Sequence, residues 1–129
     1  MAKFQRGLDF PHEGFVQAAI INHFRDQGYT IREEGFADLV CVCETRRCKW
    51  IIEAKGVTLA IGLDFRTGLG QLIQGMKEEG VNYAIAVPRT EQFLKQCSRV
   101  ATWVRLALNL HFLFVDEHSN VRVVHPHEG

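Results

Sequence analysis

The segment Trp50–Gly56, with the sequence WIIEAKG, is a short apolar run that ends in an acid and an amine. Side chains alternate between the two faces of a strand, so Glu53 and Lys55 project from the same face. Ionised groups resist transfer out of water, and a carboxylate beside an ammonium at the end of a buried strand is costly to place. The pair therefore indicates chemistry rather than architecture, with a structural salt bridge as the alternative.

A preceding predicted strand, Phe36–Glu44, carries a second carboxylate, Asp38. Both faces of this strand are mostly apolar, which is typical of a strand inside a sheet. If the connecting turn is centred on residues 46 and 47, Asp38 lies opposite Lys55 and is a diagonal neighbour of Glu53, with backbones about 7–8 Å apart. Two carboxylates at this separation can bind one cation. A turn that differs by one residue would send Asp38 to the other face.

The hydrophobic periodicity along the rest of the chain predicts helices that alternate with strands, which is typical of a mixed sheet with helices on its faces. In chain order we expect a helix over about 11–27, strands over 29–33, 36–44 and 49–55, a loop over 56–70, a helix to about 79, a strand over 82–88, a helix capped by Thr90 with an apolar stripe to Ala107, and a closing hairpin of strands 110–115 and 121–125.

Length and composition are those of an ordinary globular protein. The 129 residues predict one domain over 1–129, and 47% hydrophobic with 23% charged residues argues against disorder. We expect a cytoplasmic protein, because no apolar run is long enough to span a bilayer and the N-terminus lacks a secretory signal. The formal net charge is zero, which weighs against a purely electrostatic nucleic-acid binder but not against an enzyme that recruits divalent cations.

Two further polar residues are candidates for a site. Glu13 precedes Val16 by three positions, which places it on the apolar side of the first helix, either as a charge that the helix dipole favours or as an inward-facing catalytic group. Gln71 has Gly68 and Gly75 as neighbours at helical spacing. Glycines beside a glutamine leave room for another backbone to approach, and tight packing of the helix on the sheet is the alternative.

The pattern resembles the PD-(D/E)XK superfamily, the restriction-endonuclease-like nucleases, over about Glu13 to Pro88. The resemblance depends on Asp38 in ADLV, on Glu53-Ala54-Lys55 in IIEAKG, on the order of elements, and on Gln71 in the following helix. Ala37 stands where the motif has its proline. Glu13 is similar to the early acid of Holliday-junction resolvases, and Gln71 to the glutamine of RecB-like nucleases, although Gly75 stands where those nucleases carry a tyrosine.

This resemblance implies a restriction-endonuclease-like αβββαβ core, a mixed central sheet flanked by helices, with a third helix and a C-terminal β-hairpin. It also implies Mg²⁺ or Mn²⁺, which prefer oxygen ligands. The metal ligands would be Asp38, Glu53 and the Ala54 carbonyl, and Glu13 could hold a second ion. Lys55 would orient the attacking water, and Gln71 would position a water or a phosphate oxygen.

A basic cluster occupies the turn between the two strands. Arg46, Arg47 and Lys49 can contact a DNA backbone, and a solvated turn is the alternative. The leading hypothesis is a metal-dependent DNA endonuclease that acts on branched or repair and recombination substrates. We expect a homodimer, because so small a core leaves little surface for target recognition.

Two other functions remain open at this stage. One is a catalytically silent nuclease-fold protein that binds DNA or a protein partner. The other is a zinc-binding module built on Cys41, Cys43, Cys48 and Cys97. Zinc sites usually separate paired cysteines by two or more residues, and buried apolar cysteines are the alternative interpretation.

Overall fold

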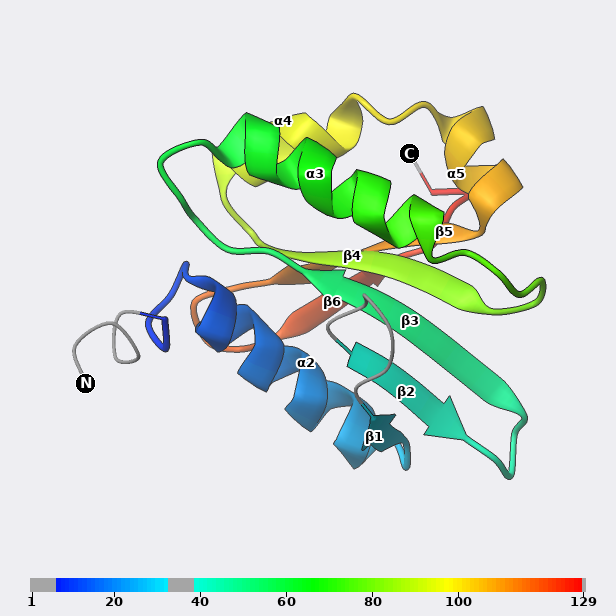
Figure 1. Cartoon of the computed structure of the whole chain (residues 1–129). Helices are drawn as coiled ribbons and strands as arrows, with labels where there is room; N and C mark the ends of the chain where they lie inside the picture. Colours follow the sequence, from blue (N-terminus) through cyan, green and yellow to red (C-terminus); the bar gives the residue numbers. More distant parts are fainter. Residues whose placement is uncertain (1–6, 33–38, 129) are drawn as a thin grey trace.

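The computed structural model describes residues 7–32 and 39–128 (Figure 1). Positions 1–6, 33–38 and 129 lie outside the described residues, and Asp38 is among them. No helix in the described ranges is long and apolar enough to cross a membrane. The helices are α2 Glu13–Asp26, α3 Ile61–Gln74, α4 Glu91–Ser98 and α5 Thr102–Leu108. The strands are β1 Thr30–Arg32, β2 Leu39–Cys43, β3 Cys48–Ala54, β4 Asn82–Pro88, β5 Leu110–Val115 and β6 Val121–Val124.

The described strands form one six-stranded mixed sheet in the order β1-β2-β3-β4-β5-β6. The pairs β1–β2, β2–β3 and β5–β6 are antiparallel, whereas β3–β4 and β4–β5 are parallel. Helix α3 connects β3 to β4, and α4 with α5 connects β4 to β5, because parallel neighbours need a crossover connection. The expected α/β class, with a mixed sheet flanked by helices and a closing hairpin, is confirmed.

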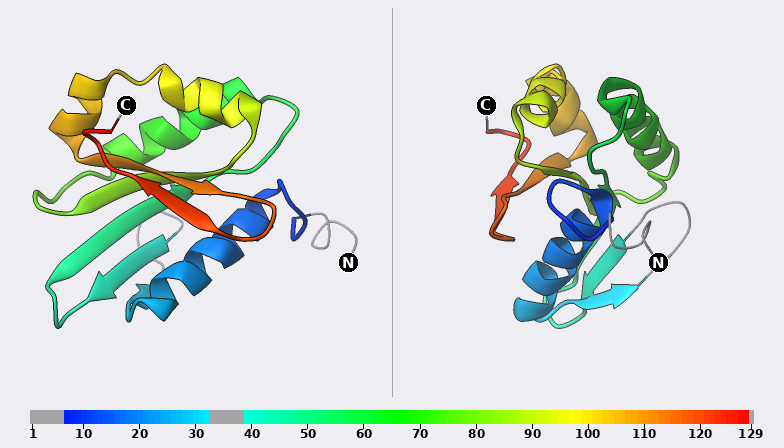
Figure 2. Two further views of the ribbon diagram at one scale, coloured as in Figure 1. Left: turned by 180° about the vertical axis from the view of Figure 1, so that it is seen from behind. Right: turned by 90° about the vertical axis from the view of Figure 1, so that its left-hand side faces the viewer.

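The helices cover both faces of the sheet, as Figures 1 and 2 show, with α2 on one side and α3 and α4 on the other. Val16, Ile20 and Phe24 of α2 pack on alternate residues of β2 and β3 in one apolar cluster. Phe65 and Leu72 of α3 pack with α4, β4 and β5 in a second cluster. The sheet is therefore sandwiched, and β3 lies between two cores.

The expected loop over 56–70 was wrong, because α3 begins at Ile61 and contains Gly62, Gly68 and Gly70. Glycine inside a helix costs about 1 kcal/mol relative to alanine, so propensity alone opposes a helix here. Tertiary packing of Phe65 and Leu72 against the sheet offsets this cost. Gly75, expected inside the helix, is instead its C-cap.

The expected single helix after Thr90 is two helices. Thr90 does cap α4, since its hydroxyl accepts a hydrogen bond from the Phe93 N–H. Ala101 then adopts an extended conformation, with φ −62° and ψ 146°, and α5 starts anew. The break reorients the chain, so that Arg105 becomes buried and the expected stripe residue Val104 does not.

The register of the β2–β3 hairpin differs from the prediction by two residues. Val40 lies opposite Ile51, not opposite Glu53, and Cys43 pairs with Cys48. The loop spans residues 44–47 instead of the expected 45–48, and Arg47 within it has φ 50°. Since the difference is two, each described residue keeps the face that was predicted for it.

We predict that Gly56→Ala destabilises the fold and that Gly70→Ala does not. A Cβ at Gly56 would lie 2.0 Å from the backbone nitrogen of Glu13, so α2 would have to move away from the end of β3. Overpacking of this kind costs about 1–3 kcal/mol. A Cβ at Gly70 meets nothing within 4 Å, and alanine should stabilise α3 by roughly 0.5–1 kcal/mol. Urea unfolding of both variants measures the difference, and equal stabilities would contradict this packing.

Candidate functional site

Glu53 and Lys55 lie at the carboxyl end of β3 and face α3. Ile52 precedes Glu53, Ala54 lies between Glu53 and Lys55, and both are fully buried on the α2 side. Because side chains alternate along a strand, Glu53 and Lys55 project from the opposite face. The Glu53 side chain is 5% exposed and the Lys55 side chain 19%. The Lys55 backbone N–H donates to the Ala86 carbonyl at 2.9 Å, so the parallel ladder holds the strand as far as this residue.

The Lys55 ammonium is near the Glu53 carboxylate without a direct hydrogen bond to it. Nζ of Lys55 lies 4.0 Å from Oε2 of Glu53, whereas charge-assisted hydrogen bonds are about 2.7–2.9 Å long. The two charges attract each other at this distance.

Gly68 of α3 makes room for the Lys55 side chain. A Cβ at Gly68 would lie 2.4 Å from Cε of Lys55 and 3.3 Å from its Cγ. The sequence predicted that another backbone approaches the glycines near Gln71. The structure shows instead that the Lys55 side chain lies against Gly68. The aliphatic part of Lys55 therefore packs against α3 at Gly68. Gln71 is exposed on α3, one turn after Gly68.

The start of α2 lies against the same end of β3. Gly56 touches the backbone of Glu13, and the Val57 N–H donates to the Pro11 carbonyl at 2.9 Å. Glu13 is the first residue of α2 and is exposed, so its expected place on the buried side was wrong. The acid lies in the first helical turn, where the helix dipole favours it. The fold thus brings the backbone of Glu13 next to the Glu53–Lys55 pair.

Asp38 lies outside the described residues, so its position relative to Glu53 stays a prediction. The adjoining part of β2 is described. Val40 is paired with Ile51 and therefore shares the face of Glu53, while Leu39 is paired with Ile52 on the α2 side.

The basic turn lies at the opposite end of β3. The seven residues of this strand separate it from Lys55 by on the order of 20 Å. Nη2 of Arg46 donates to the Gln27 carbonyl at 2.7 Å, and the Lys49 ammonium lies 2.9 Å from Oε1 of Glu78. Arg47 is exposed. The structure therefore does not bring these three residues into the Glu53–Lys55 site.

The described residues at this end of β3 supply one buried carboxylate, that of Glu53. Within residues 7–32 and 39–128, no group of three or more His, Cys, Asp or Glu side chains is placed to hold a metal. Mg²⁺, however, is commonly bound through one or two carboxylates and several waters. Glu53 supplies one buried carboxylate, and Asp38 is the predicted second.

The cysteines do not form a zinc site. All four are free, and Cys41 and Cys97 belong to cores on opposite faces of the sheet. Burial raises the pKa of each of these two thiols to about 12, so they stay protonated. Zinc needs thiolates that converge on one point, and Cys41 and Cys97 serve as small core residues instead.

Sequence reasoning missed Gly56 and expected a backbone rather than the Lys55 side chain at Gly68, although both glycines bear directly on the site. Glycine in a sequence marks either backbone freedom or close packing, and the sequence does not say which element approaches. In the sequence, the position of Gly56 directly after Glu53-Ala54-Lys55 was the one indication of close packing at this end of β3.

Comparisons with known proteins bear on the fold. No protein-family model matches the chain, and no curated protein sequence matches it. Among solved structures, it is similar to an XisH family protein from Nostoc punctiforme PCC 73102, with a TM-score of 0.57 and 17% sequence identity. The match covers 84% of this chain and 98% of that chain. The XisH family has a restriction-endonuclease-like fold, and a likeness at this identity concerns the fold alone.

We predict that Gly68→Ala displaces the Lys55 side chain but keeps the protein folded. The added methyl group would occupy the position of the Lys55 Cε, and a flexible side chain can move away from it. Alanine also favours the helix by about 1 kcal/mol. A crystal structure of the variant should show the Lys55 ammonium moved from its place 4.0 Å from Glu53, with a melting temperature close to that of the parent. An unmoved lysine would contradict the contact.

We also predict that the fold loses stability as the pH falls below about 6.5. His111 is buried beside Trp50, and burial lowers its pKa below the ordinary value of 6.5. The unfolded chain therefore binds more protons than the folded one in this range, and stability decreases as the pH falls from 6.5 towards the folded-state pKa. Urea unfolding between pH 5 and 7.5 tests this. His111→Gln should reduce the slope, and an unchanged slope would exclude His111 as the cause.

Proposed function

We propose that this protein is a divalent-metal-dependent nuclease that hydrolyses phosphodiester bonds in DNA. The observation that carries the proposal is the Glu53–Lys55 pair, in which a carboxylate that is 5% exposed lies 4.0 Å from an ammonium at the end of a buried strand. The restriction-endonuclease-like fold supports the same function.

A purely structural ion pair explains the arrangement less well. Burying two charges is repaid only when the two charged groups are in close contact. Glu53 and Lys55 do not make a direct hydrogen bond at 4.0 Å, and Gly68 holds the lysine stem so that the ammonium stays partly exposed. Such an arrangement suits a group that meets a ligand.

The proposed roles follow from the chemistry of each side chain. Glu53 and Asp38 would bind Mg²⁺ or Mn²⁺ through carboxylate oxygens, with the Ala54 carbonyl as a further ligand. The bound ion supplies Lewis acidity and a more acidic water. The Lys55 ammonium would orient the attacking water or neutralise the phosphate.

Two exposed residues at the same end of the sheet have supporting roles in this proposal. Glu13, whose backbone contacts Gly56, would hold a second ion or a metal-bound water. Gln71, one turn beyond Gly68, would donate a hydrogen bond to a phosphate oxygen or a water.

The basic turn would contact the DNA backbone away from the reacting bond. Its separation from Lys55, on the order of 20 Å along β3, is about half a helical turn of B-DNA. Arg47 is exposed and suits this contact, whereas Arg46 and Lys49 already bind Gln27 and Glu78. We propose branched repair or recombination DNA as the substrate and a homodimer as the active form.

We predict Mg²⁺-dependent cleavage that three single substitutions abolish. Linear, single-stranded and branched DNA should be incubated with Mg²⁺, with Mn²⁺ and with a chelator. Asp38→Asn, Glu53→Gln and Lys55→Ala should each lower the cleavage rate by about 10²–10⁴-fold, because each removes a group that acts on the transition state. Gln71→Ala should lower it less than Glu53→Gln.

Glu91→Gln is the matched control, since Glu91 is an exposed acid in the first turn of α4. It should cleave at the parent rate. Calorimetry should show Mg²⁺ binding to the parent protein that Glu53→Gln weakens. Cleavage near the parent rate in Lys55→Ala would remove this residue from the mechanism. DNA binding without cleavage, unaffected by all three substitutions, would favour the catalytically silent alternative.

A further inference from the structure

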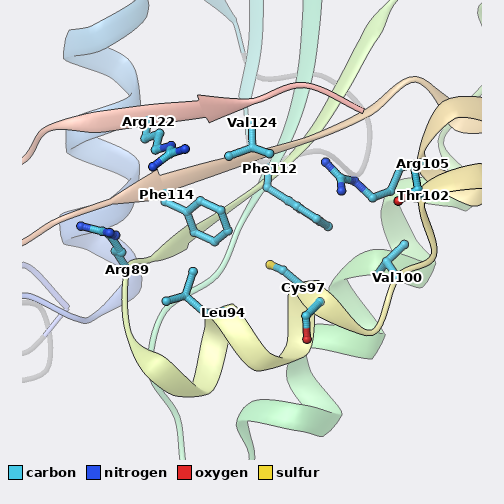
Figure 3. A pocket seen from close by; sticks show the side chains of 11 residues that line it. Arg89, Leu94, Cys97, Val100, Thr102, Arg105, Phe112, Phe114, Arg122 and Val124 are labelled. Atoms are coloured by element: carbon cyan, nitrogen blue, oxygen red, sulfur yellow. The ribbon is translucent and has the colours of Figure 1, made fainter. Parts of the chain in front are cut away.

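A second candidate site lies on the α4 side of the sheet, away from Glu53 and Lys55. A cavity of about 350 Å³ opens between α4, the start of α5 and the β5–β6 hairpin (Figure 3). Small-molecule sites in proteins are clefts of about 300–1,000 Å³, mostly apolar with a few placed polar groups. Neither Glu53 nor Lys55 lines this cavity.

Three arginines converge on the cavity from three different elements. Arg89 follows β4, Arg105 belongs to α5, and Arg122 belongs to β6. Arg122 pairs with Phe114 across the hairpin, so both project from the cavity face of the sheet. Figure 3 shows Arg89 and Arg122 near Phe114 on one side of the cavity, and Arg105 near Phe112 on the other side.

No acidic residue is among the described residues that line the cavity. The pKa of Glu128, outside the cavity lining, is lowered mainly by a hydrogen bond from the His125 N–H and also by the charge of Arg122. Cys97 also lines the cavity, and burial raises its pKa to about 12, so its thiol adds no negative charge. The cavity is therefore a local concentration of positive charge in a chain whose net charge is zero.

Arg105 is the residue in which this charge is most costly. It is 4% exposed, and its guanidinium stacks over Phe112 at 4.6 Å from the ring centroid. Nη1 donates to the Glu128 carbonyl and Nη2 to the His125 carbonyl, each at 2.8 Å, while Nε has no hydrogen-bond partner. Within the described parts of the chain, neutral carbonyls thus hold a buried cation that no carboxylate pairs with.

We propose that this cavity binds a small organic anion, a carboxylate or a phosphate monoester on a compact apolar body. Arginine recognises both head groups through paired N–H donors. An anion would offset the desolvation of Arg105, which neutral carbonyls do only in part. The apolar body would contact Leu94 and Phe114, two apolar side chains that line the same cavity.

Four matched probes test the proposal by calorimetry on the full chain. Phenyl phosphate and benzoate combine an anion with an apolar ring, inorganic phosphate lacks the ring, and benzyl alcohol lacks the charge. We expect one aromatic anion to bind at least ten-fold more tightly than inorganic phosphate and benzyl alcohol. The preferred aromatic anion identifies the head group. No binding by either of them, or equal binding by all four probes, would overturn the proposal.

Substitutions assign the bound probe to the cavity. The double variant R89Q/R122Q should weaken binding at least ten-fold, and it leaves Arg105 to hold the C-terminal carbonyls. Arg99→Gln is the matched control, because Arg99 is an exposed arginine at the end of α4 that does not line the cavity. Unchanged binding in R89Q/R122Q would overturn the assignment. Glu53→Gln should bind the probe normally, and lost binding in that variant would place the probe at the other site and overturn the proposal.

Discussion

Close packing around the carboxyl end of β3 is the constraint on which the rest of this structure depends. The strand lies between two cores, and both neighbouring helices come near its end at a glycine. Gly56 admits the backbone of α2, and Gly68 of α3 admits the side chain of Lys55. Any larger residue at Gly56 would separate α2 from the sheet, because backbone atoms cannot yield as a flexible side chain can.

The same packing determines how two charges are held in an otherwise apolar region. Glu53 is buried because its strand is buried on both faces, and Lys55 reaches the surface because its stem follows a glycine on the adjacent helix. The protein thus keeps an acid and an amine close but without a direct hydrogen bond. This acid and amine at the end of a buried strand are the physical basis of the proposed nuclease activity.

The protein has no net charge, but positive side chains gather in one part of it. A net charge of zero gives little long-range attraction for DNA. Arg89, Arg105 and Arg122 nevertheless concentrate positive charge in one cavity, although they are separated in the chain by at least sixteen positions. The two sites lie on the same side of the sheet over different strands, β3 in one case and β5 with β6 in the other. They can therefore be tested independently.

The mixed sheet and the shared face of Glu53 and Lys55 follow from the chain alone, because strand alternation and apolar periodicity are local properties. The tertiary structure set the start of α3 at Ile61, although a loop was expected as far as residue 70. Burial of Phe65 and Leu72 outweighs the low helix propensity of the glycines in this segment. The tertiary structure also decided the hairpin register, the exposure of Glu13 and the convergence of three arginines. These features depend on contacts between distant segments, and no local pattern in the chain encodes them.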